Sequence, residues 1–286
     1  MENKEFPQID RILDSIRASL KTELDSIKTE LKADLKAEMD NLKTELKAEY
    51  DGIKTGAPIP PSAPPMRTPN ESAFEGDLET REFKLSDFSS VNVGGAFEVE
   101  ITHAESYSIS VTADKGLFKN LNVAKEGDTL TIGHAKHIAW FSRITRPKAR
   151  ITMPLLKGLQ LSGASRCKVS GFSSSENLKL SLSGASSIIG DVTAGDTECD
   201  LSGASKVELT GSAKDLVINA SGANQTELGD FSVHNVAVRL SGANRTTIKM
   251  DGRLDARLSG ASSLSYLGSP TMGEIRTTGA SKISKK

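Results

Sequence analysis

The sequence predicts a mainly β protein: a single-stranded β-helix (β-solenoid) head with an N-terminal α-helical coiled-coil stalk. Three periods in the 286 residues lead to this expectation. Residues 9–53 repeat every 11 positions, residues 80–157 alternate between apolar and polar, and residues 158–286 repeat a Gly-Ala-Ser/Asn tripeptide. These periods divide the chain into a stalk (1–54), a Pro-rich linker (55–79) and a head (80–286).

The 11-residue repeat predicts one long helix. Blocks that begin at Leu20, Leu31 and Leu42 align residue for residue, and no Pro or Gly lies between Pro7 and Gly52. Lys, Glu, Leu and Ala all favour helix. An 11-residue repeat corresponds to about 3.67 residues per turn, which favours a straight or slightly right-handed supercoil.

The apolar stripe of this helix is narrow, spanning roughly 60° at 100° per residue. A lone helix with such a stripe buries little, so we expect a homo-oligomer through residues 9–53, and we take a trimer as its form. A membrane-surface helix and an isolated solvated helix are the alternatives. The membrane alternative is disfavoured because Ile9 to Gly52 contains no Trp or Phe and interleaves Lys with Glu in near balance.

Residues 55–79 predict a semi-rigid spacer. Six of the ten prolines fall within residues 55–69, a composition that favours an extended polyproline-like chain. The segment Pro61-Ser-Ala-Pro64 also fits a P-x-x-P docking motif, but that pattern is very common.

Residues 80–157 predict half-buried strands in series. Gly94-Gly95 and Glu126-Gly127-Asp128 separate the runs as turns. The alternating apolar residues are Val91, Val93, Phe97, Val99, Ile101, Tyr107, Ile109, Val111, Leu121, Val123, Leu130 and Ile132.

The Gly-Ala-Ser/Asn tripeptide recurs seven times at intervals of 18–21 residues, which indicates stacked units that each bury little alone. Relative to each Gly, the positions four and two before it and four and six after it are mostly apolar, so these columns should face inward. Gly supplies the bend. Ala should fill a tight inner corner, and Ser or Asn should bond local backbone groups. The seven glycines are Gly163, Gly184, Gly203, Gly222, Gly242, Gly260 and Gly279.

The head resembles a known bacterial family. The residues that carry the resemblance are Phe88-Ser-Ser-Val-Asn-Val-Gly-Gly-Ala-Phe-Glu-Val-Glu-Ile101, Leu130-Thr-Ile132, Ile151-Thr-Met-Pro154 and the repeated Leu-Ser-Gly-Ala-Ser. Over residues 80–286 this pattern is similar to the bacterial head GIN domain, described as a putative autotransporter adhesin head. The resemblance implies a right-handed β-helix with a surface or adhesin-like role.

One outward column of the head carries a candidate ligand site. Three residues before successive glycines stand Arg239, Arg257 and Arg276, next to a hydroxyl column that includes Ser241 and Ser259. At roughly 4.8 Å per rung, three guanidiniums could hold an anionic glycan or a carboxylate. The alternative is a purely structural role, in which Asp255 and Glu274 on the same face neutralise the stack.

Three other features have simpler interpretations. The basic aromatic segment 136–150 predicts a cap of the solenoid, with a binding loop or a membrane-touching tip as alternatives. His134 and His137 have no acidic or Cys neighbours to complete a metal site, so we expect no metal. Cys167 and Cys199 fall in inward columns and should be small buried hydrophobes.

Composition and motifs favour a non-enzymatic, structural or adhesin-like protein that needs no cofactor. The net charge of −1 disfavours nucleic acid as a partner, and no apolar run is long enough for a transmembrane segment. No Gly-x-Ser-x-Gly elbow or phosphate-binding loop is present. A cytoplasmic self-assembling scaffold and an anionic glycan-binding module are the alternatives. The partner would be a glycan or a surface protein. Without a signal peptide the expected location is the cytoplasm, or the cell surface if another route exports the chain.

Overall fold

The computed structural model describes residues 78–134 and 146–286. The predicted stalk, with its self-association, and the linker up to residue 77 lie outside the described residues, as do residues 135–145. Within the described ranges the chain is almost entirely β, and its one short helix is a 3-10 turn, η2 (Leu117–Lys119). The described ranges contain no helix of the length and apolarity needed to cross a membrane.

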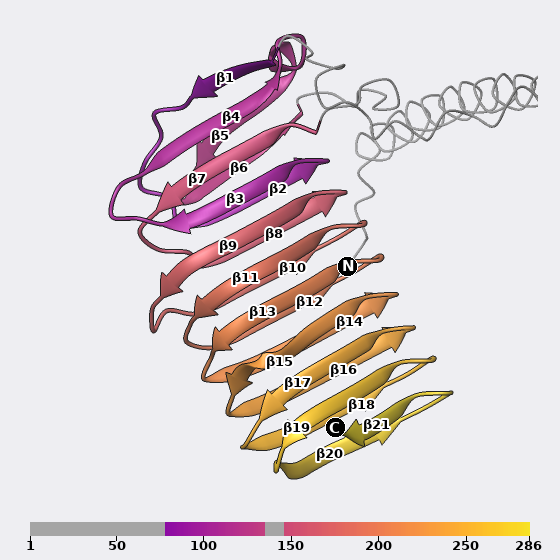
Figure 1. Ribbon diagram of the computed structural model, residues 1–286. Helices are drawn as coiled ribbons and strands as arrows, with labels where there is room; N and C mark the ends of the chain where they lie inside the picture. The colour runs from indigo at the N-terminus through magenta and orange to yellow at the C-terminus, as the bar shows by residue number, and fades with distance from the viewer. Residues whose placement is uncertain (1–77, 135–145) are drawn as a thin grey trace, which may run out of the picture. The chain divides into compact units, whose positions relative to one another are not determined.

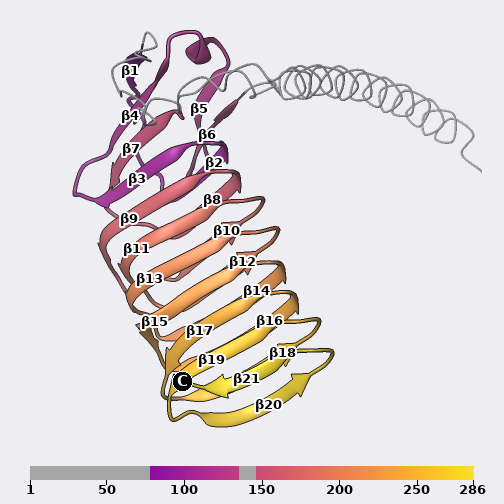
Figure 2. The same cartoon turned by 45° about the vertical axis from the view of Figure 1, so that its right-hand side comes forward.

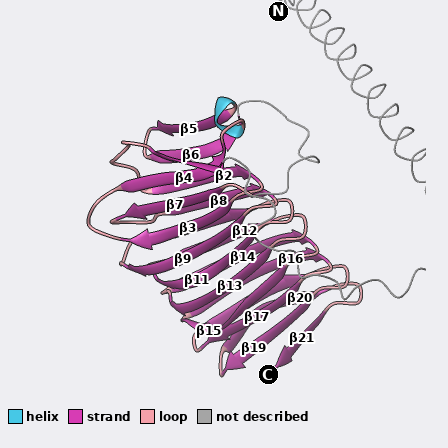
Figure 3. Ribbon diagram, turned by 45° about the horizontal axis from the view of Figure 1, so that its top comes forward, coloured by secondary structure: helices cyan, strands magenta, loops and turns pink. Residues whose placement is uncertain are grey.

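Two sheets wind together into a β-solenoid (Figures 1 and 3). Sheet A has eleven strands in the order β1 (Leu78–Glu82), β4 (Ser108–Asp114), β7 (Lys148–Met153), β3 (Glu98–His103), β9 (Arg166–Ser173), β11 (Ser187–Thr193), β13 (Lys206–Ser212), β15 (Gln225–Val233), β17 (Arg245–Met250), β19 (Ser263–Gly268) and β21 (Lys282–Lys285). Sheet B has ten strands in the order β20 (Thr271–Thr277), β18 (Arg253–Leu258), β16 (Asn235–Gly242), β14 (Asp215–Gly222), β12 (Thr197–Leu201), β10 (Leu178–Leu182), β8 (Gly158–Gly163), β2 (Ser90–Gly95), β6 (Thr129–His134) and β5 (Leu121–Glu126).

Each Gly-Ala-Ser/Asn copy is the corner that joins a sheet B strand to the following sheet A strand. The copy at Gly222, for example, connects β14 to β15. Strands of successive coils pair in parallel, and their corners lie in register, as Gly222 does with Gly242. The period of 18–21 residues is therefore one coil of the solenoid, which confirms the prediction made from the repeat (Figure 2).

The corner requires glycine for two physical reasons. Gly203 has φ +78°, a left-handed conformation that L side chains rarely adopt. An added Cβ would also lie closer than 3.0 Å to the backbone of Gly184 in the coil before. That close approach lets the N–H of Ala204 donate to the carbonyl of Gly184 at 2.8 Å, so the ladder continues around the bend.

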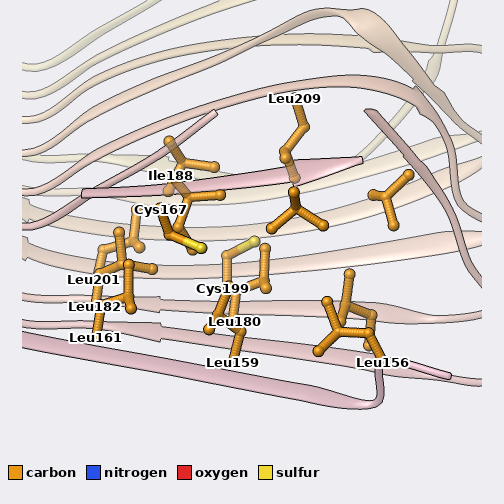
Figure 4. Close-up of a cluster of buried hydrophobic side chains, with 14 of the residues drawn as sticks. Leu156, Leu159, Leu161, Cys167, Leu180, Leu182, Ile188, Cys199, Leu201 and Leu209 are labelled. Atoms are coloured by element: carbon orange, nitrogen blue, oxygen red, sulfur yellow. The ribbon is translucent and has the colours of Figure 1, made fainter. Parts of the chain in front are cut away.

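The inward columns form the core as the repeat predicts. Leu161, Leu182 and Leu201 stack on one another along the axis, each at most 3% exposed, and a parallel column runs through Cys199 (Figure 4). The last coil differs. Ile275, which continues the column of Cys199, is 40% exposed, and Thr277, which continues the column of Leu201, is also exposed. Burial is thus a property of stacked coils, as expected for a solenoid.

The predicted role of the Ala column is wrong. From Ala185 to Ala280 the corner alanines are exposed, whereas the Ser or Asn that follows is buried at every corner but the last, as Ser205 is at 1%. The hydroxyl of Ser205 donates to the carbonyl of Ser202 at 2.9 Å, so it is satisfied locally inside the turn. A buried polar group with a partner costs little, which is why the corner tolerates it.

Two successive corners replace Ser by Asn and form a buried amide ladder. The Asn224 side-chain amide donates to Asn244 Oδ1 at 2.9 Å and to the Ser221 carbonyl at 2.7 Å. Asn224 Oδ1 in turn accepts the N–H of Ser205 at 3.0 Å. The polar corner therefore links neighbouring coils.

A different arrangement covers the N-terminal end of the solenoid. β4 pairs antiparallel with β7 and with β1, and β5 pairs antiparallel with β6. β1, β4, β5 and η2 thus cover this end, where the basic segment 136–150 is the predicted cap. Most of that segment lies outside the described residues, but Lys148 and Arg150 belong to β7 and pair with Glu98 and Glu100.

Both cysteines are free and buried, as predicted. Cys167 is 2% exposed and Cys199 is 0% exposed. Burial raises the pKa of the Cys167 thiol and raises that of Cys199 to about 12. Both groups are therefore neutral, unreactive core side chains near neutral pH.

Candidate anion-binding groove

The outward face of sheet B is hollowed into a groove of about 730 Å³. It follows the solenoid axis across seven strands, from β8 to β20, and is called the arginine groove below. Its lining consists of the two outward columns next to the corner and the edges of the leucines between them. These residues are Gln160, Ser181, Leu182, Ser183, Asp200, Leu201, Ser202, Asn219, Ala220, Ser221, Arg239, Leu240, Ser241, Arg257, Leu258, Ser259, Arg276 and Thr278.

Strand register aligns the arginines. Arg239 lies opposite Arg257, and Arg257 lies opposite Arg276, in successive parallel pairs. Parallel strands are spaced roughly 4.8 Å apart, so three guanidiniums follow one another along the axis over about 10 Å. The same column continues through Asn219 and Asp200 toward the N-terminal end.

Glu274 bridges two of the three arginines. Its Oε2 accepts from Arg257 Nη2 at 2.8 Å, and its Oε1 lies 2.5 Å from Arg276 Nε. The hydrogen bond from Arg257 lowers the pKa of Glu274, so this carboxylate is ionised at neutral pH. The charges of Arg257 and Arg276 are therefore partly compensated.

Asp255, by contrast, is committed to another partner. Its carboxylate accepts from Arg253 at 2.8 and 3.0 Å and from the backbone N–H of Glu274 at 2.6 Å. The hydrogen bond from Arg253 is the main reason that the pKa of Asp255 is lowered. Of the two carboxylates expected to neutralise the stack, only Glu274 makes ion pairs with it.

Arg239 is the least compensated cation of the groove. Within the described ranges it forms no ion pair, and its closest side-chain bond is a long one, 3.4 Å from Nη1 to Asn219 Oδ1. Ser241, two residues along on the same strand, is exposed, and its hydroxyl bonds to no atom of the described chain. This pair offers unused hydrogen-bond donors beside a positive charge.

The other half of the arginine groove is polar and close to neutral. Asp200 accepts from the Asn219 amide at 3.0 Å and pairs with Lys179 at 3.1 Å. Gln160 and Ser181 continue the column. The groove therefore changes along its length from amide and hydroxyl groups to guanidinium groups.

The structure brings all five sequence-predicted site residues together, because Arg239, Arg257, Arg276, Ser241 and Ser259 all line the groove. Sequence reasoning did not assign a role to Asn219, Asp200 or Gln160. Their position three residues before a corner, in the column of the arginines, was the signal that would have found them.

No metal centre is formed by the part of the chain that the structure describes, where no three His, Cys, Asp or Glu side chains cluster. His134 stacks on Phe97 at 5.5 Å between ring centroids, and its burial lowers its pKa. The other histidine of the pair, His137, lies outside the described residues.

A family model described as "Putative auto-transporter adhesin, head GIN domain" matches residues 87–270 and confirms the resemblance inferred from the sequence. The fold is also similar to a putative adhesin from Bacteroides fragilis NCTC 9343, with a TM-score of 0.69 and 21% identity over 73% of this chain and 97% of the other.

Two further solved structures are similar over nearly their whole length. A putative lipid binding protein from Parabacteroides distasonis ATCC 8503 has a TM-score of 0.61 and 21% identity over 74% of this chain and 98% of its own. A putative adhesin from Parabacteroides merdae ATCC 43184 has a TM-score of 0.56 and 20% identity over 74% of this chain and 97% of its own. No curated protein matches the chain in sequence. At such identities the solved structures support the β-solenoid fold alone.

Proposed function

The chain belongs to the head GIN domain family of putative auto-transporter adhesins, and from this premise we propose that residues 78–286 are a non-enzymatic, adhesin-like head that binds a partner at a cell surface. The observation that carries the proposal is the arginine groove, an open polar site built on a rigid core. A solenoid holds such a site in fixed geometry, since each outward position is set by a buried neighbour. Holding and presenting a surface requires no reactive group.

We also infer that the solenoid is right-handed and that several heads are presented together. Right-handed winding is supported by the strong preference of parallel β crossovers for that hand. Joint presentation is supported by the 11-residue repeat of residues 9–53, whose narrow apolar stripe needs a partner helix. Several linked heads would raise a weak single-site affinity through their effective concentration.

The location of the head tests this function directly. Protease added to intact cells of the source organism should remove the head, while a cytoplasmic marker protein stays intact. Purified chain should then adhere to a surface that carries the partner and compete with those cells for it. A head that is protected from protease until the cells are lysed would exclude an adhesin.

The oligomeric stalk is tested separately. Light scattering should give a multiple of the 30.5 kDa chain mass for residues 1–286 and a monomer for the compact unit Glu71–Lys286. The truncation removes the 11-residue repeat and keeps every described residue. Monomers in both samples would refute stalk-mediated assembly and leave the adhesive role of the head open to its own test.

A further inference from the structure

We propose that the arginine groove binds an acidic glycan through carboxylate or sulfate groups, with Arg239 and Ser241 as the first anchor. This inference rests on the proposed function, because it names the class of surface partner that the head would recognise. It is carried by three properties of the groove: its charge, its length and the polar character of its remaining lining.

The charge favours an anion. The lining carries three guanidiniums, those of Arg239, Arg257 and Arg276, and one carboxylate, that of Asp200. With Glu274, which pairs with two of the arginines, counted as well, the groove keeps an excess of one positive charge on a chain whose net charge is −1. Guanidinium groups present a planar fork of donors that matches carboxylate and sulfate oxygens.

The position of the excess charge identifies the anchor. Glu274 already accepts a hydrogen bond from Arg257 and forms an ion pair with Arg276, whereas within the described ranges Arg239 has only its long bond to Asn219. No carboxylate of the described residues forms an ion pair with Arg239, and Ser241 lies on the same strand, two residues away. A second acidic group would then compete with Glu274 for Arg257.

The length of the groove favours a chain over a small ion. Seven strands contribute to its lining, and six steps of roughly 4.8 Å span about 29 Å. That distance exceeds the size of a single carboxylate or phosphate. A polymer that lies along the solenoid axis would contact several rungs at once.

The remaining lining favours a saccharide. Gln160, Ser181, Asn219 and the hydroxyl column offer both donors and acceptors, which suit sugar hydroxyls. The outward side chains of the groove end in amide, hydroxyl and guanidinium groups, which can hydrogen-bond along the length of a saccharide. We therefore commit to an acidic glycan, with an anionic lipid surface as the competing outcome.

Glycan binding by the full-length chain tests the proposal. The probes are size-matched fragments of heparin (sulfate and carboxylate), hyaluronan (carboxylate only) and dextran (neutral), titrated by calorimetry at low and at high salt. We expect binding of at least one acidic fragment, none of dextran, and weakening by salt because the arginines are exposed.

Three variants locate the site. Arg239→Gln should weaken binding about tenfold, the size expected for one charge-assisted contact. Arg245→Gln is the matched control, because it removes the same charge from an exposed arginine in the same coil but on sheet A. Its affinity should stay within about twofold of the parent. Glu274→Gln should tighten binding severalfold, because it removes the negative charge that pairs with Arg257 and Arg276. All variants keep residues 1–77, so avidity affects them equally.

Several results would overturn the proposal. These are binding of neither acidic fragment, equal losses in Arg239→Gln and Arg245→Gln, and stronger binding to phosphatidylserine vesicles than to both fragments. The proposed function fails differently. If Arg239→Gln leaves adhesion of the head to its target surface intact, the adhesive role stands and this groove is not its binding site.

Discussion

Replacing Gly203 by Ala tests whether close packing between corners, and not only backbone conformation, requires glycine. Gly203 has φ +78°, and a left-handed Ala costs about 1–2 kcal/mol. An added Cβ would also lie closer than 3.0 Å to the Gly184 backbone. Displacing that backbone should add about 1–3 kcal/mol, the usual cost of overpacking. The expected total is about 2–5 kcal/mol of unfolding free energy.

Gly127→Ala is the matched control. Gly127 also has a positive φ, +59°, but no atom lies within 4 Å of an added Cβ. It should therefore show only the conformational cost of about 1–2 kcal/mol. Urea denaturation and thermal melting of the full chain measure both, and each kcal/mol should lower the melting temperature by roughly 2–4 °C. Equal losses in the two variants would refute the role of corner-to-corner packing.

Substitutions at four further buried positions probe the interior: Asn244, Thr226, Cys167 and Cys199. Asn244→Ala should cost about 2–4 kcal/mol in urea denaturation, because it leaves the Asn224 amide without its 2.9 Å acceptor, and Asn244→Ser, the residue found at other corners, should cost less. Thr226→Val should be neutral or stabilise by up to about 1 kcal/mol in the same assay, because Thr226 is 0% exposed and its hydroxyl has no hydrogen-bond partner among the described residues. A clear loss of stability would show that this hydroxyl makes a stabilising hydrogen bond. Because burial raises both thiol pKa values, the cysteines stabilise the fold fully below the unfolded thiol pKa of about 8.5, and this contribution falls as the pH rises toward about 12. Urea midpoints measured across that alkaline range should decline less in the double variant Cys167→Ala/Cys199→Ala than in the parent, and identical slopes would contradict the shift.

The repeat predicted the core correctly because the columns are a geometric consequence of the strand period. Once seven glycines were aligned, alternation placed Leu182 and Val207 inside without further information, and both are at most 2% exposed. The same alternation, carried across the corner, places the Ser or Asn inside and the Ala outside. We instead expected the small Ala to fill the inner corner, and burial of the polar residue beside it was not predicted.

Polarity failed at the corner because a turn can satisfy a hydroxyl locally. Ser186 and Ser205 each donate to the carbonyl three residues before, at 2.9 Å, so burying them costs little. We predicted this local bond correctly from the sequence, but not that the bond allows the residue to be buried. Only the geometry of the positive-φ glycine brings donor and acceptor together.

The N-terminal end was beyond sequence reasoning for a topological reason. Period-two runs indicate strands but not their partners, and here the chain does not stack its coils in sequence order. β2 lies between the later strands β6 and β8, and β3 lies between the later strands β7 and β9. A corner without the repeat's Ser or Asn, Gly95-Ala96-Phe97, also went unrecognised, although Ala164 N–H donates to Gly95 as later corners do.

The candidate site residues stood out in the sequence because outward positions are free of the packing constraints that fix the inward ones, so a run of one residue type is noticeable there. An inward Leu must match its neighbours above and below, whereas an outward residue affects the fold only through weak surface contacts. The column of Arg239 therefore varies from Gln160 to Arg276, while the column that follows it stays apolar up to Leu258 and changes only in the last coil, at Thr277. Under the proposal that the arginine groove binds an acidic glycan, the run of three arginines sets the preference for anions. Arg239, which forms no ion pair with the part of the chain that the structure describes, is the residue to change first.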